Sequence, residues 1–307
     1  MHEYDLVVIG SGPAGQKAAL AASKLGKSVA VVERNISVGG SSLHQGTIPS
    51  KTLREAAAYL SGRRERDIYG SAHRVRERIS MEDLNFRTQR VIEGEVNIIR
   101  DQMIRNFVDL IPGTASFIDA NTLHIENGDE SRRISAHFIV IATGSKPTRP
   151  EGVEFDDRRI VDSDGLLRLA EIPREMIFVG AGIIGCEYAT IFRTVGSRVT
   201  LIDRRRRPLD FIDDEIEDAL YYQMRDDGIV LRFGEHVESV SRGDDGRVVV
   251  LTKSGKQFTG DALMFAAGRE GAAGSLNLEA IGLEVDERSR IKVDEFYRTA
   301  VPSVYAI

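Results

Sequence analysis

The sequence predicts an α/β fold built from two dinucleotide-binding, Rossmann-like domains. Three observations lead to this prediction: an apolar run that enters a glycine-rich turn, an acid at the end of the next apolar run, and a second copy of the whole pattern. The first copy has GSGPAG at 10–15 and ends on Glu33, and the second has GAGIIG at 180–185 and ends on Asp203. The distance from first glycine to acid is 23 positions in both copies. One glycine fingerprint is weak evidence, whereas two in full context strongly indicate dinucleotide binding.

Each copy reads as strand, turn, helix, strand. In the first copy, the apolar run YDLVVI at 4–9 predicts a buried strand, the small-residue stretch at 16–26 predicts a helix, and SVAVVE at 28–33 predicts the next strand. The second copy repeats these elements at 175–179, 186–196 and 198–203.

The residues of the first turn have separate expected roles. Gly10 permits the tight turn, Gly12 lets the backbone approach a pyrophosphate, and Gly15 lets the helix pack closely on the strand. Pro13 suits the first helical turn, where its missing N–H costs nothing. The N–H groups at the helix start then face the phosphates, and Glu33 would accept from ribose hydroxyls.

The similarity between the two copies continues downstream. Hairpin-like strands follow each copy and lead to a last strand that ends in Ala-Thr-Gly at 142–144 or in Ala-Ala-Gly at 266–268. We therefore expect one domain from residues 1–147 and 261–307, with a second domain, 148–260, inserted into it. Two dinucleotides in adjoining domains suggest electron transfer between them.

The first copy also carries extra helices between Lys51 and Leu110. Apolar residues recur in the second of these at spacings of three and four, which predicts a buried stripe. Its members are Ile92, Val96, Ile99, Met103, Phe107 and Leu110.

Composition limits the function classes. The formal net charge of the 307 residues is −6, so no global basic field would attract nucleic acid or anionic lipid. The single cysteine cannot form an internal disulfide, which suits a reducing compartment. No apolar run approaches the ~18 residues of a membrane span, and the N-terminus lacks the basic region of a signal peptide. We expect a cytoplasmic protein.

The order of motifs resembles the flavoprotein disulfide reductases, which include lipoamide dehydrogenase and glutathione reductase. The shared features are the first fingerprint, a GG segment that ends in IPSK at 48–51, ATGS at 142–145, the second fingerprint with CEYA, and AAGR at 266–269. The resemblance covers essentially the whole chain. It implies that 1–147 and 261–307 bind FAD and that 148–260 binds NAD or NADP.

The chain departs from the family at the redox cysteines. By position these would fall at Ser42 and Thr47, and a hydroxyl cannot cycle between thiol and disulfide. The resemblance then favours FAD-dependent transhydrogenation, in which hydride passes from NADPH through FAD to NAD⁺, of the Si-specific type. Two alternatives stay open: a diaphorase or quinone reductase of the same fold, and a nucleotide-binding protein without turnover.

The catalytic residues implied by the resemblance are Lys51 and Glu187. In the family this lysine lies by the flavin and pairs with a glutamate of the second fingerprint helix. A lysine near a helix start opposes the helix dipole, which favours a functional reason for it. His44 and the lone Cys186 are expected to be structural, and no metal-ligand spacing is present.

The end of the second copy combines opposite signals for nucleotide choice. An acid such as Asp203 favours the free ribose 2′-hydroxyl of NAD, whereas arginines such as Arg204 and Arg205 favour the 2′-phosphate of NADP. A transhydrogenase must bind both nucleotides in turn. The full set of predicted cofactor-binding residues is Gly10, Gly12, Pro13, Ala14, Gly15, Glu33, Arg34, Gly39, Gly40, Ser41, Ser42, Lys51, Ala115, Thr143, Gly144, Gly180, Gly182, Ile183, Ile184, Gly185, Glu187, Asp203, Arg204, Arg205 and Gly268.

The resemblance also implies a continuation beyond SVYAI. In the family a Gly-Asp follows, whose aspartate holds the flavin ribityl chain, and a C-terminal dimerisation domain comes next. We expect full-length relatives to be homodimers, with an interface domain that this sequence lacks.

Overall fold

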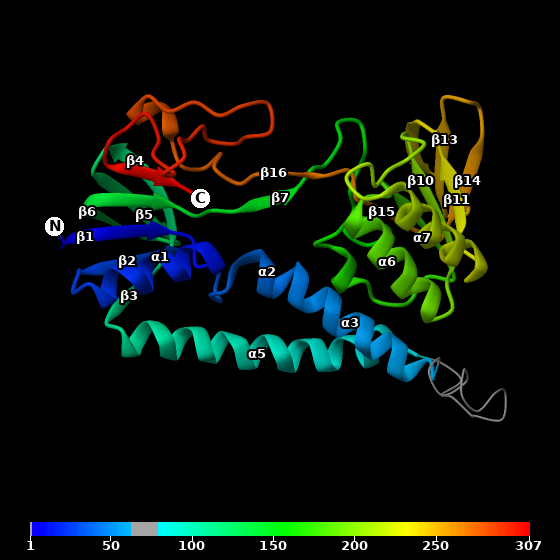
Figure 1. Cartoon of the computed structure of the whole chain (residues 1–307), viewed down its shortest axis with the longest axis horizontal. Helices are drawn as coiled ribbons and strands as arrows, with labels where there is room; N and C mark the ends of the chain where they lie inside the picture. The colour runs from blue at the N-terminus through cyan, green and yellow to red at the C-terminus, as the bar shows by residue number, and fades with distance from the viewer. Residues whose placement is uncertain (1, 63–78) are drawn as a thin grey trace. The chain divides into compact units, whose positions relative to one another are not determined.

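The computed structural model describes residues 2–62 and 79–307. The chain divides into two compact units (Figure 1). The first unit comprises 1–46, 91–146 and 269–307, and the second comprises 47–90 and 147–268.

The first unit is built on a sheet in the order β3-β2-β1-β6-β5-β4, with β17 also paired to β6. Pairing is parallel from β3 to β6 and between β6 and β17, whereas β4, β5 and β6 form an antiparallel ribbon. The strand bounds are β1 His2–Ile9, β2 Val29–Glu33, β3 Val108–Pro112, β4 Thr114–Asp119, β5 Thr122–Asn127, β6 Glu130–Ile141 and β17 Val304–Ala306.

Strand β6 joins the ribbon to the parallel sheet. Its first half pairs with β5, and its last residues, Ile139–Ile141, pair with β1 and β17. The helix α1 (Pro13–Lys24) packs on β1 and β2 through buried small residues such as Gly15 and Ala19. This arrangement brings the glycine turn to the carboxyl end of β1.

The second unit contains a five-stranded parallel sheet in the order β11-β10-β9-β15-β8. Side chains of β9 alternate between two cores, as the period of two requires. Met176 and Phe178 belong to one core, and Ile177 and Val179 to the other. The bounds are β8 Ile160–Asp162, β9 Glu175–Val179, β10 Arg198–Asp203, β11 Val230–Phe233 and β15 Ala262–Phe265.

Different elements cover the two faces of this sheet. Helix α6 (Ile183–Thr194) supplies buried residues to the core on one face, and so does α7 (Asp214–Asp226). The other face carries an antiparallel ribbon with Val240, Val248 and Val250 in its core. Its strands are β12 Val237–Arg242, β13 Val248–Thr252 and β14 Gln257–Gly260.

The extra helices differ in part from the prediction. Helix α3 (Thr47–Leu60) belongs to the second unit, and α5 (Met81–Arg105) contains the boundary between Arg90 and Val91. The expected stripe holds for Val96, Ile99 and Met103, which are buried. It is wrong for Phe107 and Leu110, because α5 ends at Arg105, Phe107 is 90% exposed and Leu110 lies on β3.

The predicted α/β class, with one dinucleotide-type domain inserted into another, is confirmed. The return to the first unit falls at Arg269 rather than at 261, because β15 pairs with β8 and β9 in the second sheet. The short strands β7 (Ser145–Pro147) and β16 (Arg269–Gly271) pair with each other where the chain passes between the units. The remaining short elements of the described residues are α2 Gly40–His44, η2 Leu166–Arg168 and η3 Leu278–Ile281.

Candidate functional site

The first glycine turn lies between β1 and α1. Gly10 has φ +107°, and a Cβ there would come within 2.3 Å of the Ala142 carbonyl oxygen. A Cβ on Gly15 would lie 2.0 Å from the Gly10 carbonyl oxygen, so both positions exclude a side chain. At Gly12, the N-cap of α1, the nearest atom to such a Cβ is 4.0 Å away. The surface over the helix start is therefore open, which suits a pyrophosphate.

Glu33 at the end of β2 fastens this turn. Its Oε2 accepts hydrogen bonds from the Ser11 amide at 3.0 Å and from the Ser11 hydroxyl at 2.6 Å. Its Oε1 accepts from the backbone and side-chain amides of Asn35, both at 2.9 Å. The Ser11 hydroxyl also accepts from the Gly39 amide at 3.0 Å. Ser11 and Asn35 thus belong to the site, although the fingerprint singled out only the glycines and the acid.

The second turn repeats this geometry in the second unit. Gly180 has φ +103°, and its Cβ would lie 2.4 Å from the Ala266 carbonyl oxygen. A Cβ on Gly185 would lie 1.8 Å from the Gly180 carbonyl oxygen, whereas Gly182 has nothing within 4 Å. Ala266 in this unit occupies the position of Ala142 in the first. The ATG and AAG strand ends therefore serve the same purpose: each closes against the first glycine of its turn.

Asp203 at the end of β10 is the counterpart of Glu33. Its Oδ2 accepts from the Ala181 amide at 2.7 Å and from the Arg205 Nη2 at 3.1 Å. Its Oδ1 accepts from the Arg205 amide at 2.8 Å and from Nε at 3.2 Å. Burial opposes ionisation of Asp203, but these hydrogen bonds outweigh it and lower the pKa of the carboxyl below its ordinary value of 3.8.

The four consecutive arginines are not equivalent. Arg205 folds back on Asp203, and Arg207 makes ion pairs with Glu217 and Asp218. Arg204 and Arg206 are exposed, and within the described part of the chain no side-chain hydrogen bond or ion pair is recorded for either. Arg206, like Arg204, is therefore a cation available to a ligand. Arg206 was not among the residues predicted from their proximity to Asp203.

The GG segment lies against the first turn. Gly39 and Gly40 have φ of +121° and +64°, and a Cβ on Gly40 would lie 2.7 Å from the Gly12 Cα. These glycines open α2, which carries Ser41 and Ser42. His44 at the end of α2 places Nε2 2.9 Å from the Val38 carbonyl oxygen, a contact that fits its expected structural role.

Lys51 and Glu187 form an ion pair within the second unit. Lys51 lies on α3 and Glu187 on α6, and buried residues of both helices belong to one core cluster. The side chain of Lys51 is 57% exposed and that of Glu187 is 17% exposed. The pairing implied by the resemblance is thus present, with the ammonium group accessible from solvent.

The remaining predicted residues are spread over both units. Pro13 and Ala14 begin α1, Ile183 and Ile184 begin α6, and Ala115 is buried on β4. Arg34 follows β2, Thr143 and Gly144 follow β6, and Gly268 follows β15. Their contact with a nucleotide stays a prediction.

Cys186 is a buried residue of α6. Its thiol donates to the Ala181 carbonyl oxygen at 3.4 Å. Burial, together with the charges of Asp203 and Glu217, raises the pKa of this thiol to about 12. The expected structural role of Cys186 agrees with this environment. In residues 2–62 and 79–307, no cluster of His, Cys, Asp and Glu could hold a metal ion.

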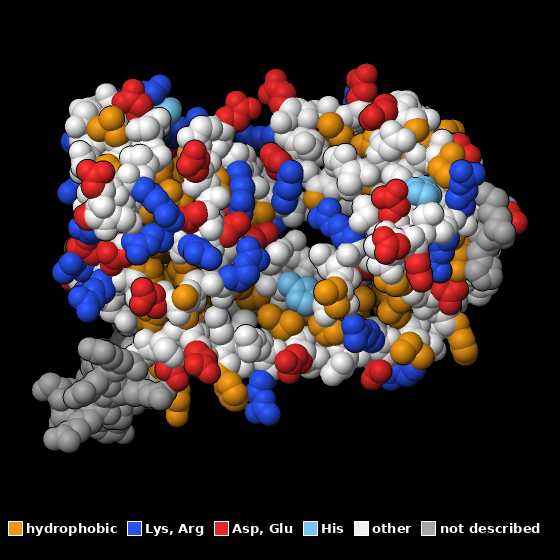
Figure 2. Space-filling model, turned by 180° about the vertical axis from the view of Figure 1, so that it is seen from behind, with side chains coloured by type: hydrophobic (Ala, Val, Ile, Leu, Met, Phe, Trp, Pro, Cys, Tyr) orange, Lys and Arg blue, Asp and Glu red, His pale blue; other side chains and the backbone are white. Residues whose placement is uncertain are grey.

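Acidic and basic side chains are interspersed on the face shown in Figure 2. None of the helices in the described ranges is long and apolar enough to cross a membrane. The cytoplasmic location stays a prediction.

The fold and the two turns define a protein of the two-dinucleotide oxidoreductase class. The family model for pyridine nucleotide-disulphide oxidoreductases matches residues 4–307, and the chain belongs to this family. It is 50% identical over its whole length to the soluble pyridine nucleotide transhydrogenase of Mycobacterium tuberculosis (strain ATCC 25177 / H37Ra). It is 42% identical over 99% of its length to the protein of that name from Colwellia psychrerythraea. The chain spans about two thirds of these relatives, 66% and 65% of their lengths.

Solved structures show the same architecture. The Cu(II) complex of the HOCl-induced flavoprotein disulfide reductase RclA from Escherichia coli matches with a TM-score of 0.88 at 29% identity, covering all of this chain and 66% of that one. The crystal structure of LpdA from Mycobacterium tuberculosis matches with a TM-score of 0.89 at 24% identity, covering all of this chain and 67% of that one. The second likeness concerns the fold alone.

Proposed function

We propose that the chain carries the nucleotide-binding and redox part of an FAD-dependent pyridine nucleotide transhydrogenase, which passes hydride from NADPH to NAD⁺ without a redox disulfide. The proposal rests on two glycine turns in one chain, each hydrogen-bonded to an acid, together with the Lys51–Glu187 ion pair. The printed name of the 50% identical relatives supports the same activity. Homodimerisation of full-length relatives and the Si-specific type stay predictions.

The residues present fit two dinucleotides. The open surface at Gly12 and at Gly182 leaves room for a pyrophosphate at each helix start, and buried acids stand at the ribose positions. FAD would lie at the first turn, and NAD or NADP at the second. When bound, FAD would supply the two-electron carrier for hydride transfer between nicotinamide nucleotides.

The chain's own contribution to the reaction is charge and position. Lys51 offers a fixed positive charge to an electron-rich ring, and Glu187 holds the ammonium group in place through their ion pair. The chain has a single cysteine, and Ser42 and Thr47 stand at the family's redox positions, which supports a reaction without a disulfide relay.

The second turn supports use of both nicotinamide nucleotides. Asp203 can accept from the 2′-hydroxyl of NAD if Arg205 yields part of its contact. Arg204 and Arg206 are available to the 2′-phosphate of NADP, for which guanidinium groups are well suited.

The activity test uses the purified 307-residue chain supplied with FAD, NADPH and thio-NAD⁺ as the acceptor. We expect acceptor reduction with ping-pong kinetics, since both nucleotides use one site in turn. Lys51→Gln should lower kcat by about 10²-fold, the lower end of the range for removing one electrostatic stabiliser. Lys146→Gln, which removes an exposed lysine paired with Glu270, should leave kcat unchanged.

Other results would favour other functions. Efficient reduction of a quinone with no reduction of thio-NAD⁺ would indicate a quinone reductase. Binding of NADPH without oxidation in the presence of FAD would indicate a nucleotide-binding protein without turnover. Sequential kinetics with a ternary complex would count against exchange at one site.

Nucleotide choice has a separate test. The double variant Arg204→Gln/Arg206→Gln should weaken NADPH binding about tenfold or more, because charge-assisted hydrogen bonds to the 2′-phosphate are lost. Binding of NADH should change little, and titration calorimetry would measure both. Arg132→Gln/Arg133→Gln, exposed on β6 of the other unit, is the matched control. Equal weakening of NADH and NADPH would contradict a role in recognising the 2′-phosphate.

A further inference from the structure

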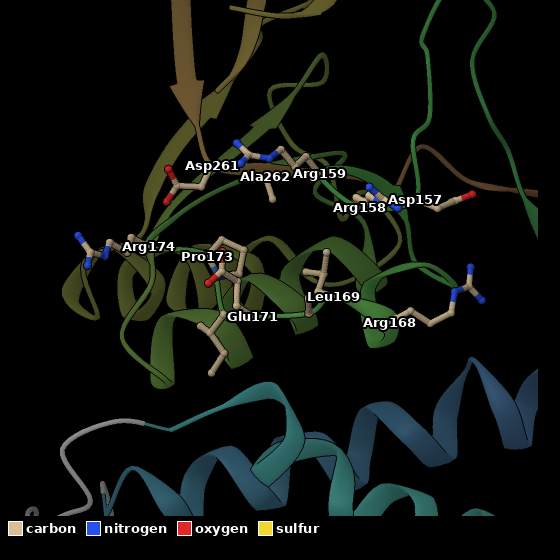
Figure 3. A pocket seen from close by; sticks show the side chains of 12 residues that line it. Asp157, Arg158, Arg159, Arg168, Leu169, Glu171, Pro173, Arg174, Asp261 and Ala262 are labelled. Carbon is tan, nitrogen blue, oxygen red and sulfur yellow. The ribbon is translucent and has the colours of Figure 1, made fainter. Parts of the chain in front are cut away.

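A pocket lies in the second unit, at the edge of its sheet opposite to the glycine turn. It has a volume of about 880 Å³ (Figure 3). One wall consists of Asp157–Arg159, which lead into β8, and of Asp261 and Ala262 at the start of β15. The facing wall is the segment 168–174, which leads into β9. The pocket therefore lies at the amino ends of parallel strands, whereas Gly180 and Asp203 lie at the carboxyl ends of β9 and β10.

The acids of the strand-side wall already have partners. The Asp157 carboxylate pairs with Arg149 at 2.5 Å. Asp261 accepts from the Glu175 amide at 2.9 Å and lies 3.7 Å from Arg247 Nε. Both cations are shared, because Arg149 also pairs with Asp162 and Arg247 also pairs with Glu175. Glu171 on the facing wall is exposed and is the third acid of the lining.

Four arginines line the same pocket. Arg159 donates to the Gly246 carbonyl oxygen at 2.6 Å. Arg158, Arg168 and Arg174 are exposed, and in the described ranges no hydrogen bond or ion pair of their guanidinium groups is recorded. The local excess is thus positive, in a chain whose net charge is −6.

Figure 3 shows how these groups lie. Arg158 is on the strand-side wall, and Arg168 and Arg174 extend from the two ends of the facing segment. Exposed arginine side chains change rotamer within nanoseconds, so the outer guanidinium groups can turn over the opening. In this view Arg158 and Arg168 lie toward the same end of the pocket.

Part of the lining is apolar. It includes Leu169, Ile172, Pro173 and Ala262, of which Leu169 and Ala262 are buried core residues. Guanidinium groups beside apolar lining residues suit a ligand with a phosphate at one end and an apolar body at the other.

We propose that this pocket binds a small organic phosphate, with the phosphate held by Arg158 and Arg168 and the apolar body against Leu169 and Pro173. Two guanidinium groups can each offer paired N–H donors to phosphate oxygens, which a lysine pair cannot reproduce. The proposal is independent of the transhydrogenase activity, because the pocket and the nucleotide turn lie at opposite edges of the sheet.

Phenyl phosphate is a simple probe of this pocket. Titration of the 307-residue chain, followed by calorimetry, should show saturable binding. Inorganic phosphate should bind at least about tenfold more weakly, because it lacks the ring that covers the apolar lining. Phenol should not bind measurably. Absence of saturable binding of phenyl phosphate, or equal affinity for inorganic phosphate, would overturn the proposal.

Variants locate the binding. Arg158→Gln/Arg168→Gln should lower affinity for phenyl phosphate by about tenfold or more, and Arg158→Lys/Arg168→Lys should retain only part of it. Arg204→Gln/Arg206→Gln should bind it as the unaltered chain does, as should Arg132→Gln/Arg133→Gln. Unchanged affinity in the Arg158/Arg168 glutamine variant, with an unchanged melting temperature, refutes the assignment. Loss of affinity in the Arg204/Arg206 variant places the probe in the nucleotide site and also refutes it.

Discussion

At the scale of single residues, the acids at the ends of β2 and β10 accept equivalent hydrogen bonds. Glu33 and Asp203 each bind the amide of the residue that follows the first glycine of their turn. Each also accepts hydrogen bonds from the residue two positions further along the chain, which is Asn35 in the first unit and Arg205 in the second. In the proposed function, a ribose hydroxyl would therefore share these oxygens with existing donors. The two sites differ mainly in the charge of that competing donor.

Asp203→Asn should destabilise the protein at neutral pH. The variant loses charge-assisted hydrogen bonds to Ala181 and Arg205, and we expect a loss of about 1–3 kcal/mol in the free energy of unfolding. Since the folded-state pKa of Asp203 is lowered, its contribution is present above the ordinary pKa of 3.8 and is lost as the pH falls through the folded value. Denaturant unfolding at several pH values, followed by circular dichroism, would measure this.

The difference from the unaltered protein should thus be greatest near pH 7 and should shrink below about pH 4. Asp129→Asn, at an exposed position in the β5–β6 turn, is the control and should cost little at any pH. If the difference in unfolding free energy stays constant down to the lowest pH at which the protein folds, the carboxylate charge is not what stabilises the turn.

Cys186 should resist thiol reagents in the native protein. Its raised pKa, about 12, keeps it a thiol at pH 8, and burial keeps reagents away. Reaction with a disulfide reagent should release close to one equivalent of chromophore only after unfolding in guanidinium chloride, because the chain has one cysteine. Rapid reaction of the folded chain would show instead that α6 opens readily.

Residues could be predicted where chemistry and spacing act together. Motif spacing predicts the glycines and both acids, and the family resemblance implies the Lys51–Glu187 pair. The structure forms both glycine turns, places the acids at the ends of β2 and β10, and contains the ion pair. Ser11 was missed because it occupies a variable position of the fingerprint. Its one signal was a small hydroxyl residue beside Gly10, which alone says nothing about a partner 22 positions away.

At the scale of elements, each turn divides its glycines into two kinds. The third glycine of each motif, Gly15 or Gly185, lies so close to the carbonyl of the first that no side chain fits. The middle glycine, Gly12 or Gly182, has ordinary φ and open space, so it is free of folding constraints. We therefore expect the middle position to serve the ligand, whereas the third allows the helix to pack closely on the strand.

Gly185→Ala and Gly182→Ala should therefore differ in kind. Gly185→Ala forces a Cβ to 1.8 Å from the Gly180 carbonyl oxygen, and we expect a loss of at least about 2 kcal/mol or failure to fold. Gly182→Ala should fold with a nearly unchanged melting temperature and should weaken binding of NADH and NADPH, because the methyl group would lie where we propose that the pyrophosphate binds. Equal melting temperatures for both variants would contradict this division.

The end of α5 shows why some boundaries escape prediction. Spacing alone continued the apolar stripe to Phe107 and Leu110, whereas Phe107 adopts φ +55° and ends the helical path. Left-handed conformations of non-glycine residues are uncommon and leave no clear mark in a hydrophobic pattern. The strands were easier to predict, because apolar runs next to glycine turns are short and well bounded.

At the scale of the whole molecule, each unit has its own core. Residues of β1, β4, β5 and β6 form a core in the first unit, and residues of α3, α6, β9 and β10 form one in the second. The sequence indicated the inserted domain but not that α3 would join it. Leu53, Ala56 and Ala57 meet α6 through contacts more than 100 positions apart in the chain, which no local pattern encodes.

Leu53→Ala and Leu123→Ala should act on different units. Both side chains are fully buried, so each truncation should cost about 2–5 kcal/mol in its own core. Hydrogen exchange should rise in α3, α6 and β9 for the first variant, and in β4, β5 and β6 for the second. Exchange that rises equally in both units for either variant would show that they unfold as one.

The division of the chain into five segments has a kinetic consequence. The segments meet at four junctions, after residues 46, 90, 146 and 268, so four covalent links join the two units. Short links hold their partners at a local concentration of the order of millimolar or above, whatever the strength of the contacts between them. The two units therefore stay linked after either of them releases its nucleotide. A single proteolytic cut would leave other links intact, so the units would not diffuse apart.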